Sequence, residues 1–145
     1  MISEQISNRT NNGLTFPRVS TFNRPSPKGL SKTLTLAVTN TISAPIGGVN
    51  VYVFNGADRA TTHVDAQNPQ ININQGDTLV LTFSISGSHP FWIKTQYSSG
   101  SSNPVTTGTI TNNGQQTSNL TWDTNGVAPG TYYYVCSIHW TSMRG

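Results

Sequence analysis

Charged side chains are scarce in this chain of 145 residues, where Asp, Glu, Lys and Arg together make up 9%, against roughly 25% in an average soluble domain. Long helices built from Glu, Lys, Ala and Leu are therefore not expected, because their building blocks are missing. The single cysteine, Cys136, excludes a disulfide scaffold. No run approaches 18 apolar residues, so the sequence predicts no membrane span.

Uncharged polar residues are abundant instead, with 59 Thr, Ser, Asn and Gln residues in total. The length fits one domain, and short alternating runs separated by Gly and Asn-Gly turns are typical of strands. The clearest run, 78–85, points Leu79, Leu81, Phe83 and Ile85 to one face, which we expect to be the core. We predict an all-β fold, an antiparallel Greek-key β-sandwich over residues 33–145. The expected strands lie at 33–39, 50–54, 70–74, 78–85, 91–95, 105–111, 116–122 and 131–136.

Residues 1–32 differ from the rest in charge and pattern. They contain five basic residues against one acidic residue, three prolines and no sustained apolar period. We interpret them as an extended basic N-terminal arm that would not fold alone. Its apolar residues are too many for a purely solvating tail, so we expect it to contact a protein partner in a multi-chain assembly. The basic residues never form a run, which argues against a nucleic-acid patch.

Four possible metal ligands stand near the C-terminus and at the end of the strongest strand. Cys136, His139 and Met143 follow one another with short spacings, and His89 lies upstream in Gly-Ser-His-Pro. Taken singly, the cysteine could be a buried apolar residue, the methionine a gap-filler and His139 a surface histidine. Together, a thiolate, two imidazoles and a thioether are the ligands of a mononuclear blue-copper site.

The sequence around these residues resembles the cupredoxins, the plastocyanin-like blue copper proteins. The segment 129–139, Pro-Gly-Thr-Tyr-Tyr-Tyr-Val-Cys-Ser-Ile-His, is similar to the family's last-strand motif, and Gln75-Gly76-Asp77 followed by His89 resembles the strand before its first histidine. The resemblance covers about Asn50 to Met143. It implies a cupredoxin-like sandwich with one copper held by His89, Cys136, His139 and Met143, and His139 as the exposed edge for electrons.

Two features depart from the family's pattern. Cupredoxins usually continue past the methionine with a final strand, whereas Met143 is followed only by Arg144 and Gly145, so we expect Met143 to be loosely held. The second feature is the basic arm without an export signal, since Met1 to Thr10 lacks a basic and apolar signal segment. These features favour a structural or assembly accessory protein of the virion- or surface-decoration type, with a metal site that is vestigial or structural. The alternative is a type 1 copper electron-transfer protein.

Other chemistry is not indicated. No general acid–base pair, phosphate loop or nucleophile elbow is present, so we do not expect an enzyme. His63 matches no ligand of the family, and we interpret it as a loop histidine. The segments 97–103, 112–118 and 123–129 read as polar loops without a functional role.

Overall fold

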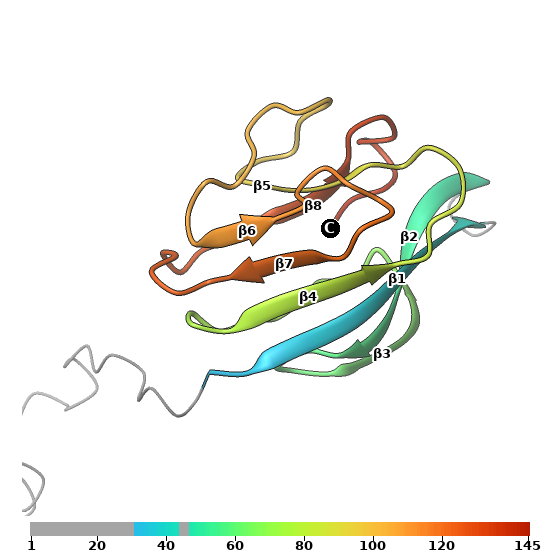
Figure 1. The fold of residues 1–145 in the computed structure, drawn as a ribbon. Helices are drawn as coiled ribbons and strands as arrows, with labels where there is room; N and C mark the ends of the chain where they lie inside the picture. Colours follow the sequence, from blue (N-terminus) through green and yellow to red (C-terminus); the bar gives the residue numbers. More distant parts are fainter. Residues whose placement is uncertain (1–30, 44–46) are drawn as a thin grey trace, which may run out of the picture. The chain divides into compact units, whose positions relative to one another are not determined.

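The computed structural model describes residues 31–43 and 47–145, and this part of the chain is all-β. It contains eight strands, which lie at β1 Thr33–Ser43, β2 Val49–Ala57, β3 Thr62–Gln67, β4 Thr78–Phe83, β5 Phe91–Lys94, β6 Thr109–Thr111, β7 Leu120–Asp123 and β8 Tyr133–Cys136 (Figure 1). The described residues form no helix, and hence no helical segment of the length and apolarity needed to cross a membrane. The expected arm, residues 1–32, lies outside the described residues except for Ser31 and Lys32.

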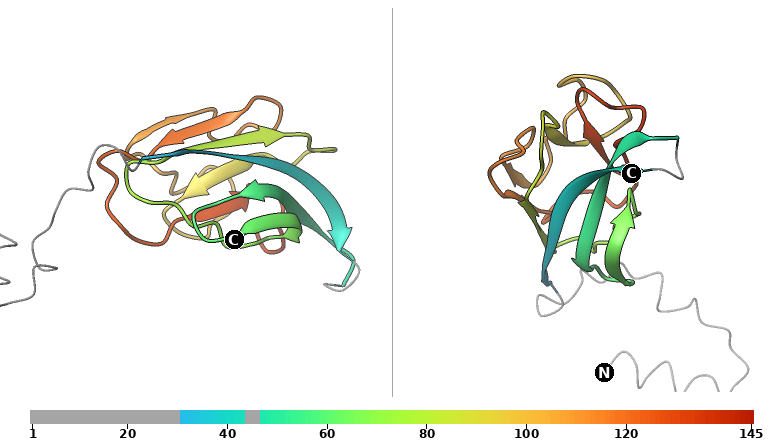
Figure 2. Two further views of the ribbon diagram at one scale, coloured as in Figure 1. Left: turned by 90° about the horizontal axis from the view of Figure 1, so that it is seen from below. Right: turned by 90° about the vertical axis from the view of Figure 1, so that its right-hand side faces the viewer.

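The strands form a six-stranded sheet, in the order β3-β2-β1-β4-β7-β6, and a two-stranded sheet of β5 and β8. Strands β5 and β8 stack against the larger sheet, as the two turned views show (Figure 2). The prediction of an antiparallel fold is wrong for one pair, because β1 and β4 run parallel, with Leu34 opposite Leu79 and Leu36 opposite Leu81. These strands are far apart in sequence, so no turn between them fixes their relative direction.

The core lies between the two sheets. As the sequence pattern predicts, Leu79 and Leu81 are buried, and Phe83 and Ile85 pack against the same cluster. Four aromatic rings form its centre, and among them Phe91 of β5 stacks on Tyr134 of β8 with the ring centroids 5.5 Å apart. The other two are Tyr52 and Phe54 of β2, whose rings lie 4.9 Å from Phe91 and Tyr134, respectively. This aromatic layer joins the small sheet to the large one.

Residues 70–74 are not a strand, although their alternation predicts one, and the strand β3 at 62–67 was not expected. The backbone amides of Asn72 and Asn74 donate to carboxylates, of Asp58 at 2.9 Å and of Asp77 at 2.8 Å, and not to a neighbouring strand. Two aspartate side chains therefore take the place of a neighbouring strand along this edge, which periodicity does not reveal. Ile71 and Ile73 still pack against the core.

A lysine is buried at the end of β5. The Lys94 ammonium is fully covered, and its Nζ donates to the carbonyls of Ser98 and Gly100, both at 2.7 Å. Burial lowers the pKa of Lys94, because an ammonium loses hydration that the carbonyls only partly replace. The segment 97–103 thus has a structural role that the sequence analysis missed: it encloses a buried charge.

Candidate metal centre

The loop after β8 carries three of the four predicted ligands. Its two ends are joined by a hydrogen bond of 2.9 Å from the Cys136 amide to the Met143 carbonyl, and the Met143 amide donates to the His139 carbonyl at 2.9 Å. The chain therefore closes a tight loop that returns His139 over the Cys136 side chain. Because Cys136 and His139 are only three residues apart, the small loop brings their side chains together, with Sγ and Nδ1 3.8 Å apart.

His89 reaches that point from the connection between β4 and β5. Phe91, the first residue of β5, pairs directly with Cys136, the last residue of β8. This register puts the residues just before Phe91 beside the loop that follows Cys136. Gly87 turns the chain with a φ of 76°, a conformation that residues with a side chain rarely adopt. The imidazole of His89 is thereby directed at the thiol.

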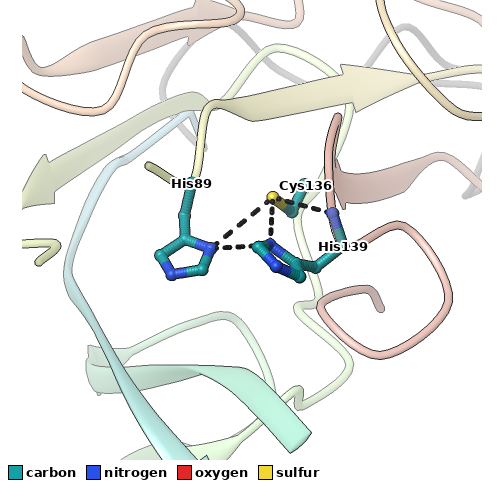
Figure 3. Close-up of side chains that lie close together, drawn as sticks. All are labelled: His89, Cys136 and His139. Atoms are coloured by element: carbon teal, nitrogen blue, oxygen red, sulfur yellow. Dashed lines mark hydrogen bonds between the residues drawn. The ribbon is translucent and has the colours of Figure 1, made fainter. Parts of the chain in front are cut away.

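Three donor atoms meet at the centre (Figure 3). The Nδ1 atoms of His89 and His139 lie 3.0 Å apart, and the Cys136 Sγ lies 3.9 Å from the first and 3.8 Å from the second. A point equidistant from all three atoms lies about 2.1 Å from each, close to metal–nitrogen bonds of about 2.0–2.1 Å and metal–sulfur bonds of about 2.3 Å. One ion fits within this triangle at bonding distance to all three residues.

The surroundings of the triangle favour the neutral form of His89. Burial lowers the pKa of His89, and the neighbouring His139 lowers it further, because a second positive charge would be repelled in a partly dry site. The backbone amide of His139 donates to the Cys136 Sγ at 3.4 Å. This hydrogen bond orients the sulfur, which binds metals as the thiolate.

Met143 is firmly held, contrary to the expectation of a loose residue. Its side chain is 0% exposed and belongs to the core cluster that includes Cys136. The residues around it pair with the free edge of β8, where Tyr134 and Gly145 exchange backbone hydrogen bonds of 3.0 and 3.1 Å. Residues 143–145 thus anchor the loop on its far side. The thioether remains our predicted fourth ligand.

Two polar side chains that the sequence analysis missed hold the turn with His89. The hydroxyl of Tyr52 donates to the His89 carbonyl at 2.9 Å, and the Oε1 of Gln116 accepts from the His89 amide at 2.5 Å. Burial raises the pKa of Tyr52 strongly, with a smaller contribution from Cys136, so its hydroxyl stays protonated and available as a donor. Gln116 lies in one of the segments interpreted as loops without a role. No motif marks either residue.

The side chain of Asn68 holds the loop of residues 136–143, which we call the ligand loop. Its Nδ2 donates to the Ser142 carbonyl at 2.6 Å, and its Oδ1 accepts from the Tyr52 amide at 3.0 Å. The loop is thereby tied to β2, the strand whose Tyr52 also holds His89. Strand β2 thus supports both His89 and the loop that carries His139.

The interpretation of His63 as a loop histidine is wrong. The residue lies in β3, is buried, and its Nε2 is 2.9 Å from the Asp58 Oδ2. Burial raises the pKa of Asp58, but hydrogen bonds from Asn72, His63, Thr61 and Ala60 outweigh it and hold that pKa well below its usual range. The pair of Asp58 and His63 supports the turn between β2 and β3. It does not belong to the cluster of possible metal ligands among the described residues.

Comparison with known protein families, with curated proteins and with solved structures finds no match to this chain. What the structure supports is an all-β, two-sheet fold with a His-Cys-His cluster and an adjacent methionine, an arrangement that resembles a type 1 copper site.

Proposed function

We propose that the chain binds one copper ion through His89, Cys136 and His139, with Met143 as a weak fourth ligand, and passes single electrons. The observation that carries the proposal is the triangle of donor atoms, whose centre lies at bonding distance from all three. A trigonal His2Cys set with a long thioether ligand is typical of blue-copper electron-transfer sites.

The donor types favour copper over zinc. Structural zinc sites take four ligands from Cys, His and carboxylates, and the cluster among the described residues has only three such ligands. The nearby Met143 adds a thioether, which is absent from the usual zinc ligands but is the weak axial ligand of His2Cys copper sites. Copper, when bound, would supply a one-electron couple between Cu(I) and Cu(II).

The residues around the cluster restrain its geometry. His89 is held through Tyr52 and Gln116, while the loop with His139 is held through Asn68. Ligands that are fixed from several sides move little, so the same triangle would serve both oxidation states. A restrained site lowers the cost of rearrangement when an electron arrives or leaves.

His139 is the proposed exit for the electron, because it is the most exposed ligand of the cluster. Its two neighbours in sequence are also exposed, Ile138 at 54% and Trp140 at 38%. Apolar side chains around a half-buried imidazole would allow a redox partner to approach closely and exclude water.

The proposal is tested by adding Cu(II) to the purified full chain and recording the visible spectrum. We expect an intense thiolate-to-copper charge-transfer band at one equivalent, and its loss in Cys136→Ser and His89→Gln. His63→Gln is the matched control, because it removes a buried histidine outside the cluster, and it should keep the band. A wild-type chain that binds no copper, or binds it equally well without Cys136, would contradict the proposal.

A building block of a larger assembly is the second proposal. The observation that favours it is a groove lined by residues 70–73 and 130–134, which offers unpaired main-chain groups to another chain.

A further inference from the structure

A groove opens on the fold between the segment 70–73 and residues 130–134. It has a volume of about 530 Å³, and its lining includes the core residues Phe91, Leu81 and Trp122. A second cavity of about 250 Å³ shares Ile73, Trp122, Gly130 and Tyr132 with it, so the groove continues along the same side. None of the lining side chains carries a formal charge.

One wall of the groove is the extended segment 70–74. Its even-numbered residues Asn72 and Asn74 are hydrogen-bonded through their backbone to the Asp58–Arg59 turn and to Asp77. In an extended chain the backbone N–H and C=O groups of successive residues point to opposite edges. The N–H and C=O groups of Ile71 and Ile73 therefore lie on the other edge, and they have no hydrogen-bond partner among the residues that the structure describes.

The other wall is the outer edge of β8 and the residues before it. Cys136 and Tyr134 use that edge to pair with Met143 and Gly145. The next residue with groups on the same edge is Tyr132, whose backbone N–H and C=O have no partner in the described part of the chain. The backbone groups of Tyr132 therefore lie on the groove side of this edge, next to the pair of Tyr134 and Gly145.

Three of the larger polar side chains of the groove already have partners within the fold. The Tyr134 hydroxyl donates to the Pro69 carbonyl, the Tyr132 hydroxyl to the Ala128 carbonyl and the Trp122 indole to the Thr107 carbonyl, at 2.7, 2.9 and 3.0 Å. Apolar surface and main-chain groups at strand spacing lie side by side on the two walls. These match an extended polypeptide, which binds by adding a strand to an exposed edge, better than a polar small molecule.

We propose that the groove binds the segment around Leu14 and Phe16 of a second copy of the chain as an added strand. These two residues are two positions apart, so in a strand both side chains point to the same face and would enter the apolar groove. Residues 10–17 carry no charge, as suits a groove without charged side chains. The segment lies outside the described residues, and the inference does not depend on copper binding.

Such a contact joins two different surfaces of the copies. A contact of this kind repeats from one copy to the next and produces rings or open chains, in contrast to a closed two-fold dimer. The full chain should therefore sediment as species larger than a monomer, in proportions that rise with concentration.

Blocking the groove tests the acceptor side by sedimentation velocity of the full chain. Gly130 lines both cavities, has no positive φ, and an added Cβ would meet no atom within 4 Å, so Gly130→Phe should fold and fill the groove. We expect its self-association constant to fall at least tenfold. Asn125→Phe is the control, because it adds the same ring on an exposed loop residue that does not line the groove; it should associate like the wild type.

The donor side is tested by the double variant Leu14→Asp, Phe16→Asp. We expect a loss of association comparable to that of Gly130→Phe, whereas Ile2→Asp with Ile6→Asp, which adds the same charge elsewhere in the arm, should have little effect. Circular dichroism on each variant separates a blocked groove from an unfolded chain. A wild type that is monomeric at all concentrations, or association that both blocking variants leave unchanged, would overturn the proposal.

A cross-link shows whether the strand comes from another copy. Chains with Phe16→Cys are mixed with chains of different tag mass that carry Gln70→Cys, an exposed residue of the groove wall. Oxidation should give a mixed disulfide dimer in yield well above that of Phe16→Cys paired with Asn125→Cys. If a chain carrying Cys at both 16 and 70 cross-links only within itself, the segment of a second copy is not the occupant.

Discussion

The side chain of Gln116 clamps the turn that carries His89 from both ends. Its Oε1 accepts from the His89 amide at 2.5 Å, and its Nε2 donates to the Gly87 carbonyl at 2.6 Å. A residue 27 positions away in sequence therefore fixes the orientation of a predicted ligand. The site is built by the connections between strands as much as by the residues that would touch a metal.

Gln116→Ala should weaken copper binding without removing a ligand. Loss of a supporting hydrogen bond around a metal ligand typically costs about 10–100-fold in affinity, and we expect a drop in that range by competition with a chelator. Gln115→Ala is the control, because Gln115 contributes only its backbone, through hydrogen bonds with Phe91 and Asn112. Equal affinities of the two variants would show that Gln116 does not position His89.

Met143 should be important for stability whether or not copper is bound. It is fully buried, so Met143→Ala should lower the free energy of unfolding by about 2–5 kcal/mol through the cavity that it leaves. Met143→Leu keeps the volume and should cost less than about 1.5 kcal/mol. Urea unfolding of the metal-free chain measures both. A small effect of the alanine variant would mean that the loop is not anchored in the core.

Replacing Lys94 should destabilise the fold, because its side chain is buried. Lys94→Ala removes the buried stem and leaves the carbonyls of Ser98 and Gly100 without their donor, and we expect a loss of about 2–4 kcal/mol in unfolding free energy. Lys32→Ala is the control, because the hydrogen bonds of Lys32 come from its backbone; it should change stability by less than about 0.5 kcal/mol.

Acid should destabilise the fold through Asp77. Its carboxylate binds Arg59 and the amides of Asn74 and Lys32, and the Arg59 hydrogen bonds are the main reason why the pKa of Asp77 is lowered to about 2. A carboxyl whose pKa is lower in the folded chain than in the unfolded chain, where it is about 3.9, stabilises the fold at a pH above that value. This contribution of about 2 kcal/mol to the free energy of unfolding disappears as the pH falls from about 4 to about 2.

Asp77→Asn should therefore flatten the pH dependence of the unfolding free energy between pH 5 and pH 2, measured by urea titrations at several pH values. Asp123→Asn removes the same charge away from Arg59 and should leave the steep part of the profile in place. An unchanged slope in Asp77→Asn would exclude this carboxylate as the acid-sensitive group.

The candidate site was accessible from sequence because its donors are chemically rare and closely spaced. Cys136, His139 and Met143 lie within eight consecutive residues, so one small loop must contain them all. The structure brings His89 to the same loop, since Phe91 pairs with Cys136. Metal binding itself stays a prediction that spectroscopy will test.

The sequence by itself determined the local features of this protein: the all-β class, the core face of Leu79 and Leu81, and the identity of the four possible ligands. The alternation of apolar residues and the types of ligand residue can be read within a few consecutive positions, so the sequence predicts them. Only the tertiary structure decided the parallel pairing of β1 with β4, the unpaired edge of residues 70–74 and the supports Tyr52, Asn68 and Gln116. The parallel pairing and the three supports depend on hydrogen bonds between residues far apart in the chain. These partners come together only when the chain folds, and the neighbouring sequence does not specify them.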